Sequence, residues 1–302
     1  MSGPIFEDLS GVSTASFSNP YDALIAASEN DPAELQARYI THRNTRNSQQ
    51  KAKMLDKDFS GPNIDPILLR LSDSTVEPGF VDPRHCLVFW GRPSQKIKNL
   101  IDRVQQELLT VAPTLEITHS KKAEEIQKIV DSLSDKIPAI TDYTVQHRAR
   151  LIKPMISFDA SALALSFVPA AGEASARGRT KADDAYTYHH LRRDLFSRCQ
   201  DIGVTVDSRY VVPSSHLTIG RFIYTKDFVD DKGVYDASKM EVFIKKIEEI
   251  NAWLEKEFWP EHHGGNVPDG ADWLVGEEKG LNCRMGTLWY GGGESVHEGQ
   301  GF

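Results

Sequence analysis

The pattern that most constrains the fold of this chain is a strand–helix–strand order that occurs twice. Residues 87–120 predict a buried strand, an amphipathic helix and a second strand with alternating apolar side chains. Residues 162–222 predict the same order again, followed by a helix over 240–258 and strands near 273–275 and 284–290. This repeat of elements predicts an α+β protein built from two similar halves.

The segments outside the repeat predict an N-terminal extension and a C-terminal tail. Asn19-Pro20 and Asp31-Pro32 each place a capping residue before a proline, which is typical of a helix start. Gly291 to Gly293 predict the end of the folded part and a mobile tail. We therefore expect a disordered leader over 1–18, a helical extension and linker over 19–84, and a main domain over 85–302, with lobes over roughly 85–155 and 156–302.

The helix that begins at Pro32 is expected to extend to about Leu55. Its later part lacks acidic residues and carries five basic ones: Arg38, Arg43, Arg46, Lys51 and Lys53. Such a run indicates either a solvated helix face or an arm that neutralises phosphates.

Composition excludes several classes of protein. The net charge of −8 over 302 residues argues against a broad basic surface for duplex nucleic acid. Three cysteines without metal-ligand spacing indicate a reducing compartment. The sequence shows no apolar run long enough for a transmembrane helix, and its first residues do not have the pattern expected of a secretory leader. We expect no membrane partner and a cytoplasmic location, with the nucleus as the alternative.

His216 and Thr218 are the strongest candidates for chemistry. They lie in the run VVPSSHLTIGRF, where alternation points both side chains to one face of a strand and Leu217 and Ile219 to the other. An imidazole beside a hydroxyl can transfer a proton and hold a phosphate oxygen together. The same spacing also fits a half-buried strand whose polar face meets solvent.

Several segments resemble those of a known superfamily. They are YDALIAASENDPAELQARYITHR, VDPRHCLVFWGRP, YTYHHLRRDLF, RYVVPSSHLTIGRF and GTLWYGGGESV. With the duplicated pattern, they resemble the two-histidine (2H) phosphoesterases, which include 2′,3′-cyclic phosphodiesterases, over roughly residues 87–290. The resemblance is to the fungal branch described as RNA ligase/cyclic nucleotide phosphodiesterase. It implies a bilobal fold whose antiparallel sheets line a central cleft.

The resemblance also implies a mechanism. Each half of such a protein carries one His-x-Thr motif, and the two motifs face each other across the cleft. One histidine acts as general base and the other as general acid, and an ordinary histidine pKa suits both roles. The threonine hydroxyls hold the phosphate oxygens, so the resemblance implies neither a metal nor a cofactor.

The first His-x-Thr motif is missing from this chain. If Thr114 is the motif threonine, Ala112 occupies the histidine position, and alanine cannot move a proton. Only residues 111–113 separate the predicted helix from the predicted strand, fewer than the resemblance implies. We therefore expect His216 and Thr218 to be catalytic, with Thr114 as a substrate-binding residue.

Four other histidines are poor substitutes for the missing one. By strand alternation His119 faces away from Thr114. His85 belongs to a different strand. His189 and His190 are expected on the surface of a helix, about 100° apart, and so cannot easily face one ligand.

Four more histidines have an open role. His262 and His263 lie in a glycine-rich loop that can hold a metal, but the sequence shows no third ligand. His42 and His147 stand among basic residues and can either meet a phosphate or lie on a solvated face.

Two further residues are candidates for substrate binding. Strict alternation places Arg221 on the face opposite Thr218, unless a β-bulge turns it back. Arg221 is expected either to pair with a carboxylate or to bind phosphate. Tyr290 can stack a nucleobase or pack in the core.

The sequence thus supports one main hypothesis and two alternatives. The main one is a metal-independent cyclic phosphodiesterase acting on a 2′,3′-cyclic nucleotide or RNA-end phosphate, impaired by the missing histidine. The first alternative is a module that binds such an end without turnover. The second is a protein-interaction role for the N-terminal helices.

Overall fold

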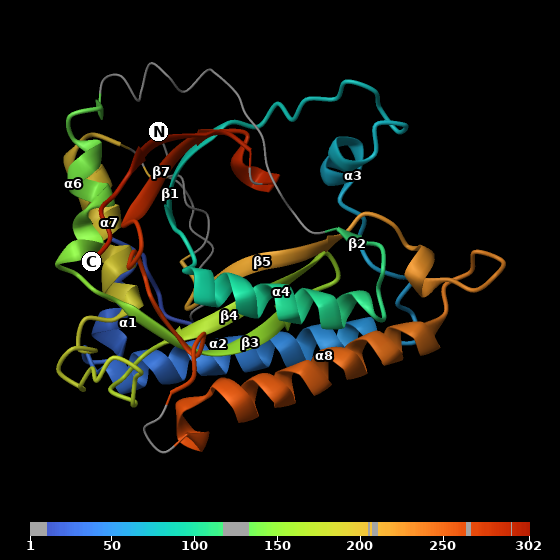
Figure 1. The fold of residues 1–302 in the computed structure, drawn as a ribbon, viewed down its shortest axis with the longest axis horizontal. Coiled ribbons are helices and arrows are strands. Elements are labelled where there is room, and N and C mark those ends of the chain that lie inside the picture. Colours follow the sequence, from blue (N-terminus) through green and yellow to red (C-terminus); the bar gives the residue numbers. More distant parts are fainter. Residues whose placement is uncertain (1–10, 117–132, 205, 207–210, 264–266, 291) are drawn as a thin grey trace.

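The computed structural model describes residues 11–116, 133–204, 206, 211–263, 267–290 and 292–302 (Figure 1). Its helices are α1 (Asp22–Ala27), α2 (Pro32–Met54), α3 (Pro66–Ser72), α4 (Gln95–Leu109), α6 (Ile137–Thr141), α7 (Tyr188–Asp201) and α8 (Ala237–Phe258). Its strands are β1 (Cys86–Gly91), β2 (Leu115–Glu116), β3 (Arg150–Phe158), β4 (Ala162–Pro169), β5 (Ser215–Phe222), β6 (Asp272–Leu274), β7 (Leu281–Gly286) and β8 (Glu294–Glu298). Within these residues, no helix is long and apolar enough to cross a bilayer.

The strands form two antiparallel sheets, which confirms the predicted α+β class. The larger sheet has the order β2-β5-β4-β3-β6 and the smaller one the order β1-β7-β8. In Figure 1 the smaller sheet lies at the upper left, beside α6 and α7. Leu87 and Phe89 of β1 pack with Ile137 of α6, so this side of the smaller sheet is apolar.

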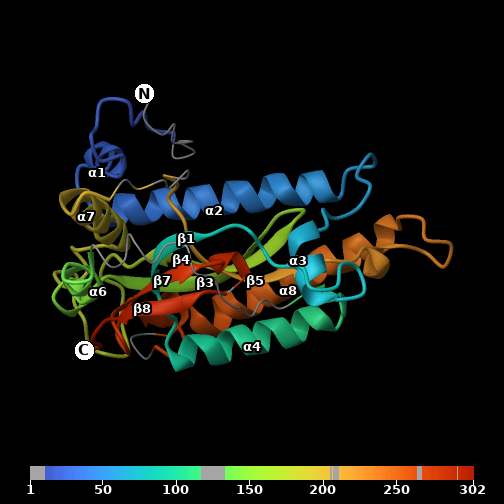
Figure 2. The same ribbon diagram turned by 90° about the horizontal axis from the view of Figure 1, so that it is seen from above.

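Helices cover both faces of the larger sheet (Figure 2). The main core lies on the side of α4 and α8, where Leu163 and Leu165 of β4 and Ile219 of β5 pack against their apolar stripes. On the opposite face, α2 packs its Leu35 and Tyr39 against Val168 of β4 and its neighbours. Figure 2 shows α2 and α4 on opposite sides of the strands.

Helix α2 is part of this packed structure. Asp31 caps it as predicted, since its Oδ1 accepts the N–H of Ala33 at 2.9 Å. Arg43, which the sequence places in a solvated or phosphate-binding run, is instead buried and donates to the Lys153 carbonyl at 2.7 Å. Asn47 donates to the Ile156 carbonyl at 2.9 Å. The extension is therefore docked on the sheet through its polar side chains.

One strand of the larger sheet lies across the position expected to separate the two lobes. This strand is β3, which the sequence did not predict, and β1 pairs with β7 near the C-terminus. Strand β3 escapes prediction because Lys153-Pro154 interrupts its alternation, and a register shift lies between Ile152 and Met155. Strand β8 follows Gly291 to Gly293, so the predicted mobile tail is wrong.

The loop between β4 and α7 is anchored by buried polar side chains. Thr187 caps α7, where its hydroxyl accepts the N–H of His189. Asp184 is buried, and its carboxylate accepts the Arg150 Nε–H at 3.2 Å and an Nη2–H at 2.6 Å. A buried bidentate ion pair thus ties this loop to β3.

Candidate functional site

Strand β5 presents His216 and Thr218 on one face, as the alternation predicts. Both side chains are exposed, whereas Ile219 is 2 % exposed and belongs to the core. On β4, Ser166 and Ala164 are their cross-strand partners and lie on the same face, which is the side covered by α2. The imidazole and the hydroxyl therefore stand together at the accessible margin of the sheet.

A β-bulge turns Arg221 to this same face. The register pairs Thr218 with Ala164 and Gly220 with Leu163, which leaves Ile219 as the extra residue. Arg221 then pairs with Ala162, two positions from Ala164 and hence on the face of His216. The bulge also puts Gly220 on the core side, where an added Cβ would lie 2.8 Å from a Leu115 methyl.

Arg221 and Tyr290 meet at one carboxylate. The Nη1 of Arg221 lies 3.4 Å from Asp65 Oδ2, and the Tyr290 hydroxyl donates to Asp65 at 2.7 Å. Asp65 also caps α3 by accepting the N–H of Leu68. Arg221 therefore pairs with a carboxylate, which is one of the two roles predicted for it. Tyr290 is buried and bonds to the same carboxylate, in keeping with the predicted packing role.

The surroundings of His216 favour its neutral form. Its Nδ1 lies 3.0 Å from Ser214 Oγ, and when Nδ1–H donates to Ser214, Nε2 carries the free lone pair. Desolvation by the surrounding protein is the largest cause of the lowered pKa of His216, although its side chain is exposed to solvent. Repulsion from Arg192 and His42 lowers the pKa further, and attraction by Asp159 offsets this lowering only in part. At neutral pH the imidazole is therefore a proton acceptor.

Helical geometry explains why His42 approaches β5. At about 100° per residue, Lys51 lies about 80° around the axis of α2 from Arg43. Lys51 pairs with Glu248 of α8, so this side of α2 faces α8. His42 lies about 100° the other way, on the flank of Tyr39, whose hydroxyl bonds to α7 at His189. This flank faces away from α8 and toward β5, where His42 and His216 interact electrostatically.

Replacing His42 with glutamine is expected to raise the pKa of His216. His42 opposes protonation of His216, so removing it makes the imidazolium easier to form. NMR titration of the His216 ring measures the shift. Arg38→Gln, on an exposed position of the same helix, is the control and leaves the titration unchanged. An unchanged His216 pKa in the His42 variant would contradict this arrangement.

The residues expected from the first half do not reach His216. The Thr114 hydroxyl donates to Asp227 at 2.6 Å. Its neighbour Leu115 pairs with Phe222, six positions beyond His216, which at the usual strand rise is about 20 Å away. Ala112 is 0 % exposed in the core, so a histidine placed there would be buried rather than join the site.

His189 and His190 are buried, contrary to the predicted helix surface. His189 donates from Nε2 to the Tyr21 carbonyl at 3.0 Å and accepts from the Tyr39 hydroxyl, and burial lowers its pKa to about 3. His190 completes the capping box of α7, and burial lowers its pKa to about 4. Both stay neutral and join α7 to the N-terminal segment.

The other candidate histidines lie apart from this face. His147 stacks on Tyr143 with ring centroids 3.8 Å apart, and His85 precedes β1. His119 falls outside the described residues. His262 and His263 follow α8, and no cluster of three or more potential metal ligands occurs within the described part of the chain.

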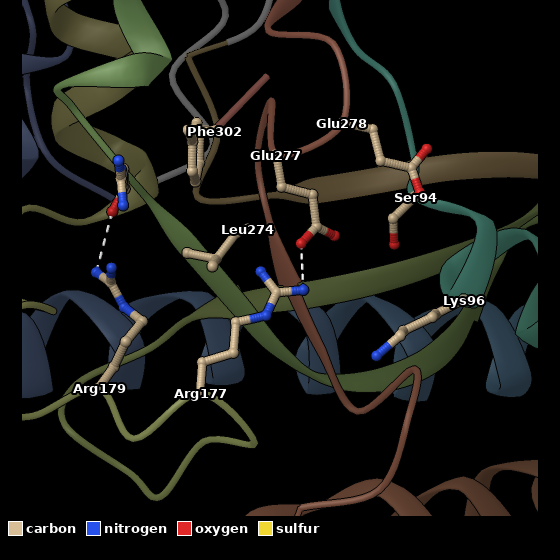
Figure 3. A pocket seen from close by; sticks show the side chains of 9 residues that line it. Ser94, Lys96, Arg177, Arg179, Leu274, Glu277, Glu278 and Phe302 are labelled. Atoms are coloured by element: carbon tan, nitrogen blue, oxygen red, sulfur yellow. Dashed lines mark hydrogen bonds and ion pairs between the residues drawn. The ribbon is translucent and has the colours of Figure 1, made fainter.

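A pocket of about 490 Å³ lies elsewhere, where Arg177 and Arg179 approach the C-terminal segment (Figure 3). Two of its arginines are paired: Arg177 forms an ion pair with Glu277, and Arg179 pairs with Asp184 and donates to the Arg148 carbonyl. None of the site residues predicted from the sequence lines this pocket.

Comparison with known proteins leaves the family open. No protein-family model, curated protein or solved structure matches this chain. The residues of the β5 face therefore carry the functional argument alone.

Proposed function

We propose that the β5 face binds phosphate esters and that the protein is a cyclic phosphodiesterase of the 2H phosphoesterase type. The observation that carries the proposal is the shared exposure of His216 and Thr218 on one strand face. The neutral imidazole and the positive charge of Arg192 suit an anionic substrate. In a 2′,3′-cyclic nucleotide or RNA-end phosphate, the leaving group is one of the two ribose oxygens of the cyclic ester.

Each side chain has a role in hydrolysis. His216 Nε2 removes a proton from water as the water oxygen attacks phosphorus. The bond from phosphorus to one ribose oxygen breaks, and that oxygen takes a proton from solvent. The Thr218 hydroxyl donates to a phosphate oxygen, which holds the reacting group beside the imidazole. Arg192 contributes positive charge, while the contact with Asp65 orients Arg221.

A second candidate is an end-binding module without turnover. It is favoured by the buried Ala112 and by the Thr114 hydroxyl, which is committed to Asp227. Neither residue can complete a pair of His-x-Thr motifs around one phosphate. Such a module uses the same β5 face and the same ligand class.

Incubation with a 2′,3′-cyclic mononucleotide separates the two candidates. The enzyme opens the ring to a phosphomonoester, detected by chromatography, and EDTA leaves the rate unchanged because the proposed steps use side chains alone. Binding without ring opening favours the module. Neither binding nor ring opening would contradict both candidates.

A further inference from the structure

A second cluster of arginines and aromatic rings lies on the smaller sheet and its adjoining loop. Arginines alternate there with aromatic rings, and we call this set the arginine–aromatic ladder: Arg84, Tyr290, Trp289, Arg284, Trp90 and Arg92. Arg84 stacks over Trp289 at 5.2 Å and over Tyr290 at 5.3 Å. Arg284 and Arg92 stack over Trp90 at 5.4 and 4.8 Å.

Strand pairing places Trp90 and Arg284 on one face. Trp90 pairs with Asn282, so Arg284 is its diagonal neighbour on β7. The opposite face packs Phe89 and Leu87 into an apolar core with α6, which leaves the ladder face half-open. Trp289 is 58 % exposed at the adjoining turn.

The charges of Arg92 and Arg284 lack a carboxylate partner in contact within the described residues. Burial lowers the pKa of both, and their mutual repulsion lowers that of Arg92 further. The buried Arg284 Nε has no hydrogen-bond partner, although Nη2 donates to the Gly292 and Gly293 carbonyls. Glu298 attracts Arg92 but is engaged by Lys279. Two guanidiniums held around one indole therefore present an unmatched site for an anion.

Arg84 and Tyr290 connect the ladder to the β5 face. The Arg221 guanidinium lies 5.7 Å from the Tyr290 ring that Arg84 also contacts. The Gly292 and Gly293 carbonyls join Arg284 to the same turn. A run of arginines and aromatic rings thus extends from β5 across the smaller sheet. Asp65 lies 3.4 Å from Arg221 and Asp82 pairs with Arg84 at 2.8 Å, so the unmatched charge of this run lies at Arg92 and Arg284.

We propose that this ladder binds a single-stranded RNA segment, its bases on Trp289 and Trp90 and its phosphates on Arg284 and Arg92. Planar rings with interleaved guanidiniums suit stacked bases linked by phosphates. The inference rests on the proposed function in one respect, that the terminal phosphate of this segment lies at the β5 face. It assigns oligonucleotide ends, rather than free mononucleotides, as the preferred substrate class.

Fluorescence anisotropy with a labelled single-stranded RNA of about eight nucleotides tests the ladder. Trp289→Ala is expected to weaken binding by about tenfold, the value of one stacked base. Arg92→Gln weakens binding and reduces the slope of log affinity against log salt by about 0.7, the contribution of one phosphate contact. The matched control is Arg103→Gln, which removes an arginine stacked 4.6 Å from Trp253 and leaves affinity unchanged. Circular dichroism verifies that each variant is folded.

Two results would overturn the ladder: wild-type protein that does not bind the oligonucleotide, or ladder variants that bind like the control. Failure of the ladder and failure of the proposed function have different signatures. His216-dependent ring opening without oligonucleotide binding contradicts the ladder alone. Ladder-dependent binding without ring opening supports the ladder and contradicts the enzyme.

Discussion

Replacing His216 with alanine is expected to lower the rate of 2′,3′-cyclic nucleotide hydrolysis by about 10²–10⁴-fold, the usual contribution of one positioned proton-transfer group. His216 is an exposed imidazole with a lowered pKa, and it lies beside Thr218. A water molecule that fills the space left by the alanine variant is a much weaker base than this imidazole. Initial rates across pH measure the effect. Because the base must be neutral, wild-type activity falls as the pH drops through the His216 pKa, which lies below its ordinary value.

His262→Ala is the matched control for this substitution. His262 is exposed in the turn after α8, so its removal is expected to change neither the rate nor its pH dependence. Thr218→Val provides a second readout, because loss of the hydroxyl removes a contact to phosphate and raises KM. Equal rates for the His216 and His262 variants would contradict the assignment of the general base.

The largest expected effect on stability comes from Arg150→Ala. The Arg150 side chain is fully buried, and it bonds to the buried carboxylate of Asp184 and to the Glu173 carbonyl at 2.6 Å. Alanine leaves Asp184 buried without its main partner, at a cost of about 3–5 kcal/mol in the free energy of unfolding. Arg179, 3.3 Å from Asp184, compensates in part.

Urea denaturation measures this loss. Lys96→Ala is the control, because the Lys96–Asp269 pair is largely solvent-exposed and contributes little. The control is expected to leave the unfolding midpoint nearly unchanged. A shift in the Arg150 variant no larger than that of the control would contradict a structural role for the buried pair.

Local pattern predicted much of the fold because several elements have regular periodicity. The apolar spacing of α4, the alternation of β5 and the Asp31 cap all match the structure. Strand β3 was missed because Lys153-Pro154 interrupts the alternation of side chains on which strand prediction depends. In the structure Lys153 has a positive φ of 56°, which local sequence does not predict for a lysine.

The site was only partly predictable, for a different physical reason. Alternation places His216 and Thr218 together, but the extra residue at Ile219 decides the face of Arg221. The sequence named His42 only as a histidine among basic residues. Its electrostatic effect on His216 depends on the docking of α2 on β3 and β4, which no local pattern predicts. In the basic run of α2, Arg38, Arg46 and Lys53 are exposed, as a solvated helix face requires. Arg43 departs from this prediction, because it is buried and donates to the backbone of β3.

The central claim is that phosphate esters bind at the face of His216 and Thr218. The most direct test follows the ring resonances of the ten histidines while a 2′,3′-cyclic nucleotide is added. We predict saturable shifts at His216 and His42, with His147 and His262 unmoved. Saturable shifts confined to other histidines, or no shift at His216 at any nucleotide concentration, would contradict the claim.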